Sequence, residues 1–326
     1  QGDELAYHGF ASSFVDGDGW QYGDGKSSRV PLLPAQLAAI YSIAGPVTGL
    51  ARWYMVLVSA SIAPLLFLLA RSLYPGHWYA ALLAGMAWAL YPPAIWYGSQ
   101  LLTETMAALL VVSGLWVFVS AARSGSLWLA ALTGIIWGLS VMNRSSFLLL
   151  PLAMLLVHLL LWKVRSKTGW NPRQWSVALI AVVMVLLPWT VRNAVIHGVF
   201  LPTESRAGYA LLVTNVDLEH PQIRSGRYTK DLGDLTPIIA QGESEVDQDA
   251  IMRRLALDEI KENWHLLPRI ILNRAKNFWT TRPDPYDDDW TFNDSVMLPI
   301  WGGVLVFSLT SSFMRSWRRN WPALTV

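Results

Sequence analysis

The sequence predicts an α-helical integral membrane protein of about seven spans that carries a small mixed α/β extracytoplasmic domain. Hydrophobic residues make up 53% of the 326 residues and charged residues only 15%, which is more apolar than one water-soluble core of this length requires. The charges are also unevenly distributed. Regions 52–192 and 296–326 together hold one acid, Glu104, whereas the rest of the chain holds the other acids. The bilayer is therefore the expected solvent for these two regions.

Seven apolar runs are long enough to cross, or nearly cross, a hydrocarbon layer about 30 Å thick. They lie at about 53–70, 78–97, 105–122, 126–142, 147–162, 175–191 and 296–314. Pro92-Pro93 falls near the end of the second run, where we expect the helix to break and the polar residues 97–100 to form a turn.

The basic residues predict the orientation of these spans, because Lys and Arg in short loops stay in the cytoplasm. Three arginines, Arg52, Arg144 and Arg192, fall on one side. Nine basic residues fall on the other side: Arg71, Arg123, Lys163, Arg165, Lys167, Arg173, Arg315, Arg318 and Arg319. We therefore expect the side with three arginines, which also holds the acidic segments, to face outward.

This pattern divides the chain into four segments. Residues 1–51 form an outer-face loop with juxtamembrane helices, and residues 52–192 form the transmembrane helical bundle. Residues 193–295 form the extracytoplasmic domain, and residues 296–326 form a further span and a basic cytoplasmic tail. Gln1 opens directly into a polar segment that lacks the features of a signal peptide. We expect a membrane span upstream of it and further spans after Val326.

The extracytoplasmic segment mixes two kinds of pattern. Short β-like runs, such as Tyr209 to Thr214, predict strands, and the apolar spacing from about Val246 to Trp279 predicts one amphipathic helix. The last turns of that helix carry basic residues beside aromatic ones, a composition suited to the level of the lipid headgroups.

Composition excludes several functions. The chain has no cysteine, so it forms no disulfide framework, and its net charge of +2 is too small to indicate nucleic-acid binding. The six histidines show no metal-ligand spacing. The run 284–289 contains an Asp-x-Asp, but no Gly-rich strand-to-helix pattern accompanies it, which favours a solvated acidic turn.

The first candidate site is the N-terminal stretch with Asp3, Glu4, Tyr7 and His8. Adjacent acids point in different directions on a helix, so one could accept a proton while the other binds a substrate group or a cation. The alternative is a first helical turn whose acids only complement the helix dipole.

The second candidate is Glu104, because an intramembrane carboxylate is costly and usually functional. A structural alternative is an acid at a helix N-terminus with Thr103 as the cap. The third candidate comprises Arg144 and Arg192, whose guanidinium groups could bind the phosphate of a membrane-embedded lipid. The alternative for both arginines is snorkelling toward the headgroups.

These motifs, in this order, resemble the GT-C class of membrane glycosyltransferases. The specific resemblance is to the superfamily of protein O-mannosyltransferases and lipid A aminoarabinose transferases, which is glycosyltransferase family 39-like. The residues that carry it are Asp3-Glu4 with Tyr7, the turn 16–20, the stretch Val30 to Pro34, the run Ser99 to Glu104, Asn143-Arg144, and the Pro-Trp-x-x-Arg-Asn run 188–193.

The resemblance implies an inverting transfer of a sugar from a polyprenyl-phosphate donor on the outer, periplasmic face of a bacterial inner membrane. Asp3 would be the base, Glu4 and Glu104 would orient the acceptor or bind a cation, and Arg144 and Arg192 would bind the donor phosphate. Accessory residues would be Tyr7, His8, Lys26 and Arg29.

No nucleotide or metal cofactor is required by this chemistry, although a divalent cation can be accommodated. The partners would be the donor, membrane lipids, and a lipid, glycan or protein acceptor, with no nucleic acid. The aminoarabinose branch has Glu-Lys-Pro where this chain has Lys26 to Pro31, so a Glu metal ligand is missing here.

Two other functions fit part of the sequence. Short, Pro-broken spans with intramembrane charges also occur in secondary transporters and flippases, but the chain shows no repeated half, and its charges lie at the outer surface. A polysaccharide polymerase or ligase would differ by consuming a polyprenyl-diphosphate glycan.

Overall fold

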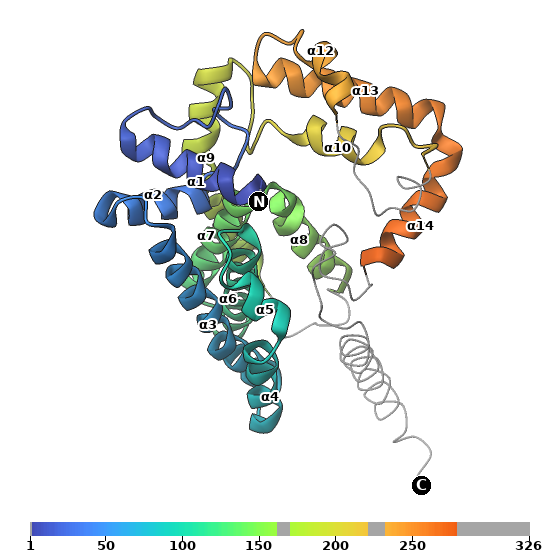
Figure 1. Cartoon of the computed structure of the whole chain (residues 1–326). Helices are drawn as coiled ribbons and strands as arrows, with labels where there is room; N and C mark the ends of the chain where they lie inside the picture. The colour runs from blue at the N-terminus through green and yellow to red at the C-terminus, as the bar shows by residue number, and fades with distance from the viewer. Residues whose placement is uncertain (1, 162–169, 221–231, 279–326) are drawn as a thin grey trace. The chain divides into compact units, whose positions relative to one another are not determined.

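A computed structural model describes residues 2–161, 170–220 and 232–278 of the chain (Figure 1). The described residues are mainly helical and contain no β-strand, apart from an isolated bridge between Tyr22 and Gly25. Two compact units can be distinguished, which are described separately: residues 1–208 with 237–251, and residues 209–236 with 252–326. The predicted span 296–314 and the acidic run 284–289 lie outside the described residues.

The first unit contains the predicted membrane helices. Its elements are α1 (Gly2–Asp16), α2 (Leu32–Ala44), α3 (Thr48–Leu73), α4 (Trp78–Ala89), α5 (Pro92–Tyr97), α6 (Thr103–Ser124), α7 (Leu127–Asn143), the 3-10 turn η1 (Ser145–Leu149), α8 (Leu150–Leu161) and α9 (Pro172–His197).

Three of these helices, α3, α6 and α9, are long and apolar enough to cross a membrane. Shorter apolar helices cover Leu32–Ala44, Trp78–Ala89, Leu127–Asn143 and Ser145–Leu160. The protein is thus a helical membrane protein, and the seven-span count remains a prediction. The expected break near the end of the second run is present, because α4 ends at Ala89 and a separate helix, α5, begins with Pro92 and Pro93. Proline is tolerated there because the first turn of a helix has no partner for its amide.

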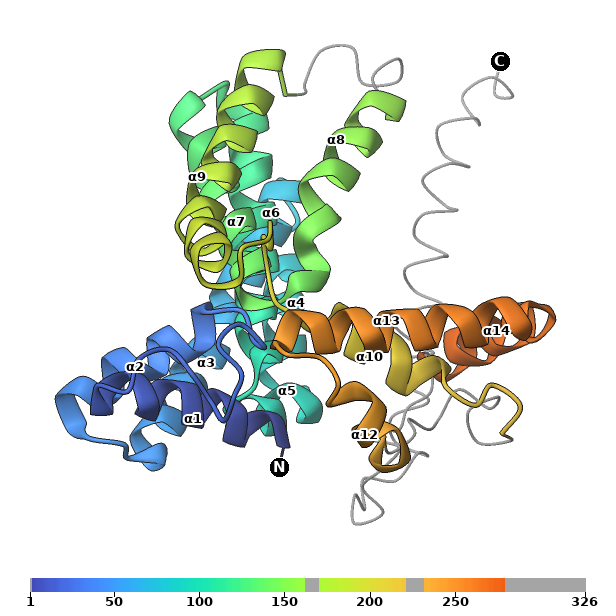
Figure 2. The same cartoon turned by 90° about the horizontal axis from the view of Figure 1, so that it is seen from above.

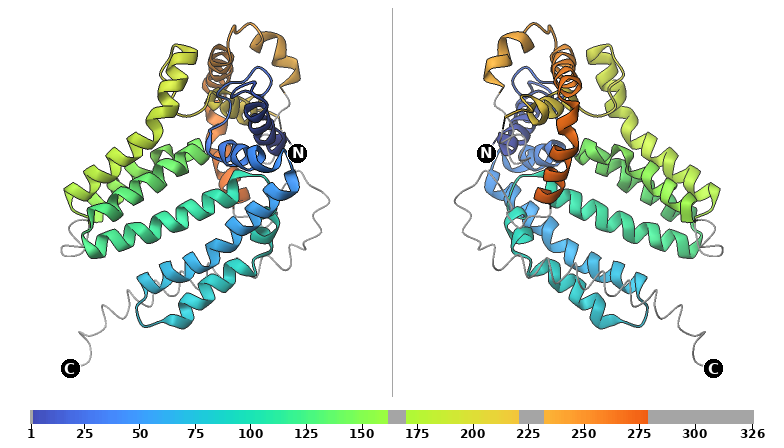
Figure 3. Two further views of the ribbon diagram at one scale, coloured as in Figure 1. Left: turned by 90° about the vertical axis from the view of Figure 1, so that its left-hand side faces the viewer. Right: turned by 90° about the vertical axis from the view of Figure 1, so that its right-hand side faces the viewer.

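The bundle is a row of neighbouring helices in the order α4, α3, α6, α7 and α9 (Figure 3). The closest approach is between α7 and α9, where α7 presents glycines at positions 134 and 138. A Cβ at Gly134 would lie 2.1 Å from the carbonyl oxygen of Ala178, and one at Gly138 would lie 2.7 Å from Cβ of Val185. Small residues one helical turn apart let two membrane helices pack backbone against backbone.

An aromatic cluster fastens α6, α7 and α9 together. Trp137, Trp170 and Trp175 are buried with the ring of Phe118 among them, and the Trp170 indole N–H donates to the Phe118 carbonyl at 3.0 Å. Asn171 and Gln174 form a capping box at the start of α9, which satisfies two amides of the first turn. These contacts fix the end of the bundle remote from α1.

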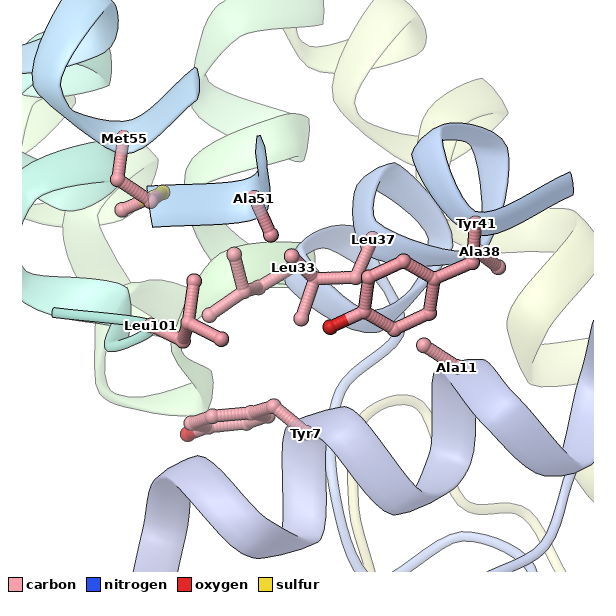
Figure 4. Packing of buried hydrophobic residues seen from close by; sticks show 9 residues of the cluster. All are labelled: Tyr7, Ala11, Leu33, Leu37, Ala38, Tyr41, Ala51, Met55 and Leu101. Carbon is pink, nitrogen blue, oxygen red and sulfur yellow. The ribbon is translucent and has the colours of Figure 1, made fainter. Parts of the chain in front are cut away.

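Helices α1 and α2 lie side by side and pack against the start of α3 (Figures 1 and 2). Their core is the cluster shown in Figure 4, which joins residues from α1, α2, α3 and the turn before α6. Its members are Tyr7, Ala11, Leu33, Leu37, Ala38, Tyr41, Ala51, Met55 and Leu101. This core holds the N-terminal helix against the end of the bundle at which α3 and α6 begin.

The remaining helices are α10 (Ala207–Asn215), the 3-10 turn η2 (Gly233–Leu235), α12 (Thr236–Ile239), α13 (Glu245–Glu262), the 3-10 turn η3 (Trp264–Leu266) and α14 (Leu267–Phe278). The predicted strand at Tyr209 to Thr214 is wrong, because these residues lie in α10. Ala210, Leu211 and Leu212 are strong helix formers, and the strand preference of their neighbours Tyr209, Val213 and Thr214 depends on the packing context. A mixed α/β domain is therefore not supported by the described residues.

The single amphipathic helix predicted from Val246 to Trp279 is also corrected. It is two helices, α13 and α14, separated at Asn263 and η3. Pro268 accounts for the break, since its ring would clash with the carbonyl four residues earlier in a continuous helix. Leu218, Leu266 and Ile270 form the core around this corner.

Candidate active site

The two acids of α1 contact different arginines. Oδ1 of Asp3 lies 2.5 Å from Nη2 of Arg29, and Oε1 of Glu4 lies 3.2 Å from Nη1 of Arg52. Successive residues on a helix are rotated by about 100°, which is why neighbouring carboxylates point to different partners. The side chain of Asp3 is 59% exposed and that of Glu4 only 13%.

Glu4 is a bridge between three elements. Its Oε1 also accepts the backbone N–H of Leu101 at 2.8 Å, and Arg52 donates in turn to the carbonyl of Ser99 and to Oε1 of Gln100. The carboxylate thereby ties α1 to the first turn of α3 and to the polar turn before α6. A buried carboxylate with both a charged and a backbone donor is well satisfied, so Glu4 has the environment of a positioning group.

Asp3 has the opposite environment. Its exposed carboxylate is held by Arg29, whose side chain is 9% exposed and lies with its guanidinium carbon 5.8 Å from the centre of the Tyr7 ring. Among the described residues Arg29 donates to Oδ1, and Oδ2 of Asp3 makes no hydrogen bond. A buried arginine needs a counter-charge, and Asp3 supplies it.

Tyr7 connects this acid to the next group of residues. It stands one helical turn after Asp3, it is buried, and Figure 4 shows it facing Leu101. Burial raises the pKa of the Tyr7 hydroxyl and Asp3 and Glu204 add to this, whereas Arg29 and a hydrogen bond with Thr103 oppose it. Tyr7 is therefore a neutral hydroxyl at physiological pH, in contact with Thr103 of α6.

Glu104 and Arg144 form an ion pair across the start of α6 and the end of α7. Oε1 of Glu104 lies 2.6 Å from Nη1 of Arg144, which also donates to the Thr103 hydroxyl at 3.2 Å. The two side chains are 43% and 40% exposed. Burial lowers the pKa of Arg144, but the charge and hydrogen bond of Glu104, together with the charges of Tyr7 and Asp3, raise it by more. The net pKa is raised, and the guanidinium stays charged.

This geometry bears on the structural alternatives, in which Thr103 caps the helix of Glu104 and Arg144 only snorkels toward the headgroups. Thr103 is not the helix cap, since Leu102 occupies that position without a side-chain hydrogen bond and Thr103 is the first helical residue. The Thr103 carbonyl instead accepts from the Asn143 amide at 2.9 Å. Arg144 is held by Glu104 and Thr103 through Nη1, and within the described part of the chain Nε and Nη2 make no hydrogen bond.

Glu204 is a residue that the sequence did not single out. Its Oε1 accepts from the Ser145 hydroxyl at 2.6 Å, directly beside Arg144 in the chain, and its charge acts on Tyr7. The Trp189 indole fixes the stretch that carries it, donating to the Thr203 carbonyl at 2.6 Å. An acid shortly after the Arg-Asn run was visible in the sequence, but no periodicity connected it with the other acids.

Arg192 belongs to a second polar network. Its guanidinium donates to the Ser27 hydroxyl, the Asn193 side-chain oxygen and the carbonyls of Trp20 and Lys26, at 3.0 to 3.2 Å, and it lies 4.6 Å from the Trp189 ring centre. Neutral acceptors thus occupy both Nη atoms. In this structure Arg192 braces the loop before α2, and its role in phosphate binding stays a prediction.

Glu245 completes the same network, and no sequence pattern had indicated it. It accepts the backbone N–H groups of Lys26 and Ser27 at 2.9 and 2.8 Å and lies 3.0 Å from Nε2 of His197. More than two hundred residues separate it from that loop, so no local pattern indicates the contact. The Lys26 side chain is exposed.

His8, another predicted accessory residue, contacts the Tyr41 hydroxyl at 3.0 Å through Nδ1. It faces α2 and not the ion pairs. Among the described residues, no three His, Cys, Asp or Glu side chains lie close enough together to hold a metal ion. The candidate site is therefore a set of carboxylates and arginines: Asp3, Arg29, Glu104, Arg144 and Glu204, joined through Tyr7 and Thr103.

Fold and site together define a helical membrane protein with a cluster of acids and arginines at one end of its bundle. A family model for dolichyl-phosphate-mannose-protein mannosyltransferase matches residues 28–190, half of the chain. The chain belongs to this family and is a membrane glycosyltransferase, as the sequence resemblance predicted. No curated protein and no solved structure matches the chain. The matched range includes Arg29, Glu104 and Arg144, whereas Asp3, Glu4, Arg192 and Glu204 lie outside it.

Proposed function

We propose that this protein is an inverting glycosyltransferase that moves a sugar from a polyprenyl phosphate to an acceptor hydroxyl on the outer face of the membrane. Family membership supports the donor class, because its description names a lipid-phosphate-linked mannose. One observation supports the proposal most directly. The exposed carboxylate of Asp3, which is held by the buried Arg29, lies close enough to the half-exposed Arg144 to affect its pKa.

The proposed reaction is a single displacement at the anomeric carbon. The acceptor hydroxyl gives its proton to Asp3, its oxygen bonds to the anomeric carbon, and the bond from that carbon to the phosphate oxygen breaks. Polyprenyl phosphate leaves with the bonding electron pair. General-base catalysis of this kind contributes about 10²- to 10⁴-fold when the base is correctly placed.

Each residue of the cluster then has a role that follows from its environment. Arg29 holds Oδ1 of Asp3 and orients Oδ2 toward the acceptor. Arg144 binds the departing phosphate through its outward donors, and Glu104 positions the guanidinium through their ion pair. Glu4, buried against Arg52 and the Leu101 amide, positions α1. Such preorganised charges act most strongly where water is scarce.

The outward orientation is supported by the distribution of basic residues. Arg71 and Arg123 lie in the last turns of α3 and α6, and Arg123 donates to the Ser72 carbonyl, so both are at the end opposite the candidate site. An excess of arginine and lysine marks the cytoplasmic end of a bundle. The site would therefore face the outer side of a bacterial plasma membrane.

The test is a transfer assay with the full-length protein in lipid nanodiscs, using a panel of purified polyprenyl-phosphate sugars that includes the mannosyl donor. We expect release of polyprenyl phosphate and a product of inverted anomeric configuration, without added nucleotide. Consumption of a polyprenyl-diphosphate glycan instead would identify a polymerase or ligase. Movement of the donor between leaflets without cleavage would identify a flippase, and both results would contradict the proposal.

A further inference from the structure

Helix α14 presents an apolar face to the outside of the second unit. Ile271 is 61% exposed and Leu272 is 54% exposed. Pro268 and Ala275, also exposed, lie on the same side of the helix, because residues three and four apart share a face. Trp264, in the turn directly before the helix, is 68% exposed. Large apolar side chains gathered in one patch indicate an interaction surface.

The opposite face of α14 is fixed by packing, so the exposure of this patch follows from the fold. Ile270 is 1% exposed and packs in the core with Leu218 and Leu266. Arg274 donates to the Asn215 side chain and to the Thr214 carbonyl, which holds the helix against α10. Rotating Ile271 and Leu272 inward would expose Ile270 and break both contacts of Arg274.

Charge distinguishes α14 from the helix that precedes it. Helix α14 contains Arg269, Arg274 and Lys276 and no acid, whereas α13 contains six acids and three basic residues. Arg269 and Lys276 are exposed, and both lie next to Leu272 around the helix axis, along one edge of the apolar face. An apolar stripe flanked by cations, with a tryptophan at its end, is the composition of a helix that lies in a membrane interface.

We propose that α14 and Trp264 bind the surface of the bilayer, with Ile271 and Leu272 inserted at the headgroup boundary and with Arg269 and Lys276 bound to anionic lipid headgroups. The partner is a lipid surface because the chain is a membrane protein and because the patch is cationic at its edge. The described charges on this face are cations only, which match an anionic lipid surface and do not indicate a protein partner. The proposal is independent of the catalytic roles assigned above.

Residues 1–326 contain no cysteine, so a cysteine introduced on α14 is the single labelling site within them. Single variants Ile271→Cys and Leu272→Cys of the full-length protein are labelled with a fluorescent probe and placed in nanodiscs of phosphatidylcholine and phosphatidylglycerol. Asp258→Cys is the matched control, since its side chain on α13 is 55% exposed. Quenching by nitroxide-labelled lipid is compared with quenching by aqueous iodide.

We expect lipid quenching at 271 and 272 to exceed that at 258 by roughly threefold or more, with iodide showing the reverse order. Efficient iodide quenching at 271 and 272 would overturn the proposal, because the face would then be in water. Protection from both quenchers would overturn it equally, because a protein surface would then cover the helix.

A second arm tests the headgroup charge. The double variant Arg269→Gln, Lys276→Gln, made in the Ile271→Cys background, removes both exposed cations without altering the packed face. Lipid quenching should fall in phosphatidylglycerol nanodiscs to the level seen with phosphatidylcholine alone. The matched control is Arg254→Gln on α13, which should leave quenching unchanged. Unchanged quenching in the double variant would refute the binding of anionic headgroups.

Discussion

The carboxylate of Glu104 lies 2.6 Å from the guanidinium of Arg144, although 40 positions separate the two residues. One residue stands in the first turn of α6 and the other follows the last residue of α7. The pair joins two residues that the sequence analysis treated as separate candidates, an acid in the membrane body and an arginine at the end of a membrane helix. Because the two residues are paired, a substitution of either one also changes the environment of the other.

The ion pair predicts different outcomes for two substitutions of the arginine. Arg144→Ala should weaken donor binding by about 1–3 kcal/mol, the range for a charged hydrogen bond, and Arg144→Lys should weaken it less. Lysine keeps the charge opposite Glu104 but loses the planar fork that can bind a phosphate while holding the carboxylate. Donor affinity in nanodiscs measures both, and equal affinity in both variants and the wild type would exclude Arg144 from the phosphate site.

Glu104→Gln tests the partner of the same pair. The amide removes the charge that positions Arg144, so turnover should fall by roughly ten- to a thousandfold, while the fold survives because both side chains are half exposed. A double-mutant cycle with Arg144→Lys should show strong non-additivity. Additive effects would mean that the two residues act independently.

The two acids of α1 should respond differently to removal of their charges. Asp3→Asn should lower the turnover of the folded enzyme by about a hundredfold or more. It should also lower stability, because the buried guanidinium of Arg29 loses its counter-charge. Glu4→Gln should mainly lower stability, by about 1–3 kcal/mol, because Glu4 is buried and holds Arg52 and the Leu101 amide. Normal turnover of the Asp3 variant would refute the base assignment.

Tyr7 predicts an effect of alkaline pH on stability. Its pKa is raised in the folded protein by burial, above the ordinary tyrosine value of about 10. The unfolded state therefore loses its proton first, so the stability that Tyr7 contributes is complete below about pH 10 and is lost as the pH rises further. Tyr7→Phe should lose less stability than the wild type between about pH 10 and 11. Thermal unfolding in detergent across this range measures the difference, and identical slopes would contradict it.

The contact between α7 and α9 predicts the cost of adding one methyl group. Gly134→Ala places a Cβ 2.1 Å from the Ala178 carbonyl, so the two backbones must separate. The expected loss of stability is about 1–3 kcal/mol, as for overpacking of a core. Gly49→Ala in α3 is the matched control, since a Cβ there meets nothing within 4 Å. A Gly134 variant as stable as the Gly49 variant would show that these helices pack less closely than described.

The sequence by itself determined the helical membrane class, the proline break at 92–93, the adjacent acids of α1 and the arginines at the helix ends. Hydropathy, proline and charge act on residues that are close together in the sequence, so their effects can be predicted from the sequence. It also indicated the family, which the family model confirms over residues 28–190.

Only the tertiary structure decided which charges meet. It assigned Arg29 to Asp3, Arg52 to Glu4 and Arg144 to Glu104. It bound Arg192 to the loop before α2 and brought Glu245 to the same loop from more than two hundred residues away. It replaced the expected strand near Tyr209 with a helix. Pairings of this kind depend on helix packing and on the burial of each side chain, and neither is encoded in the spacing of residues along the chain.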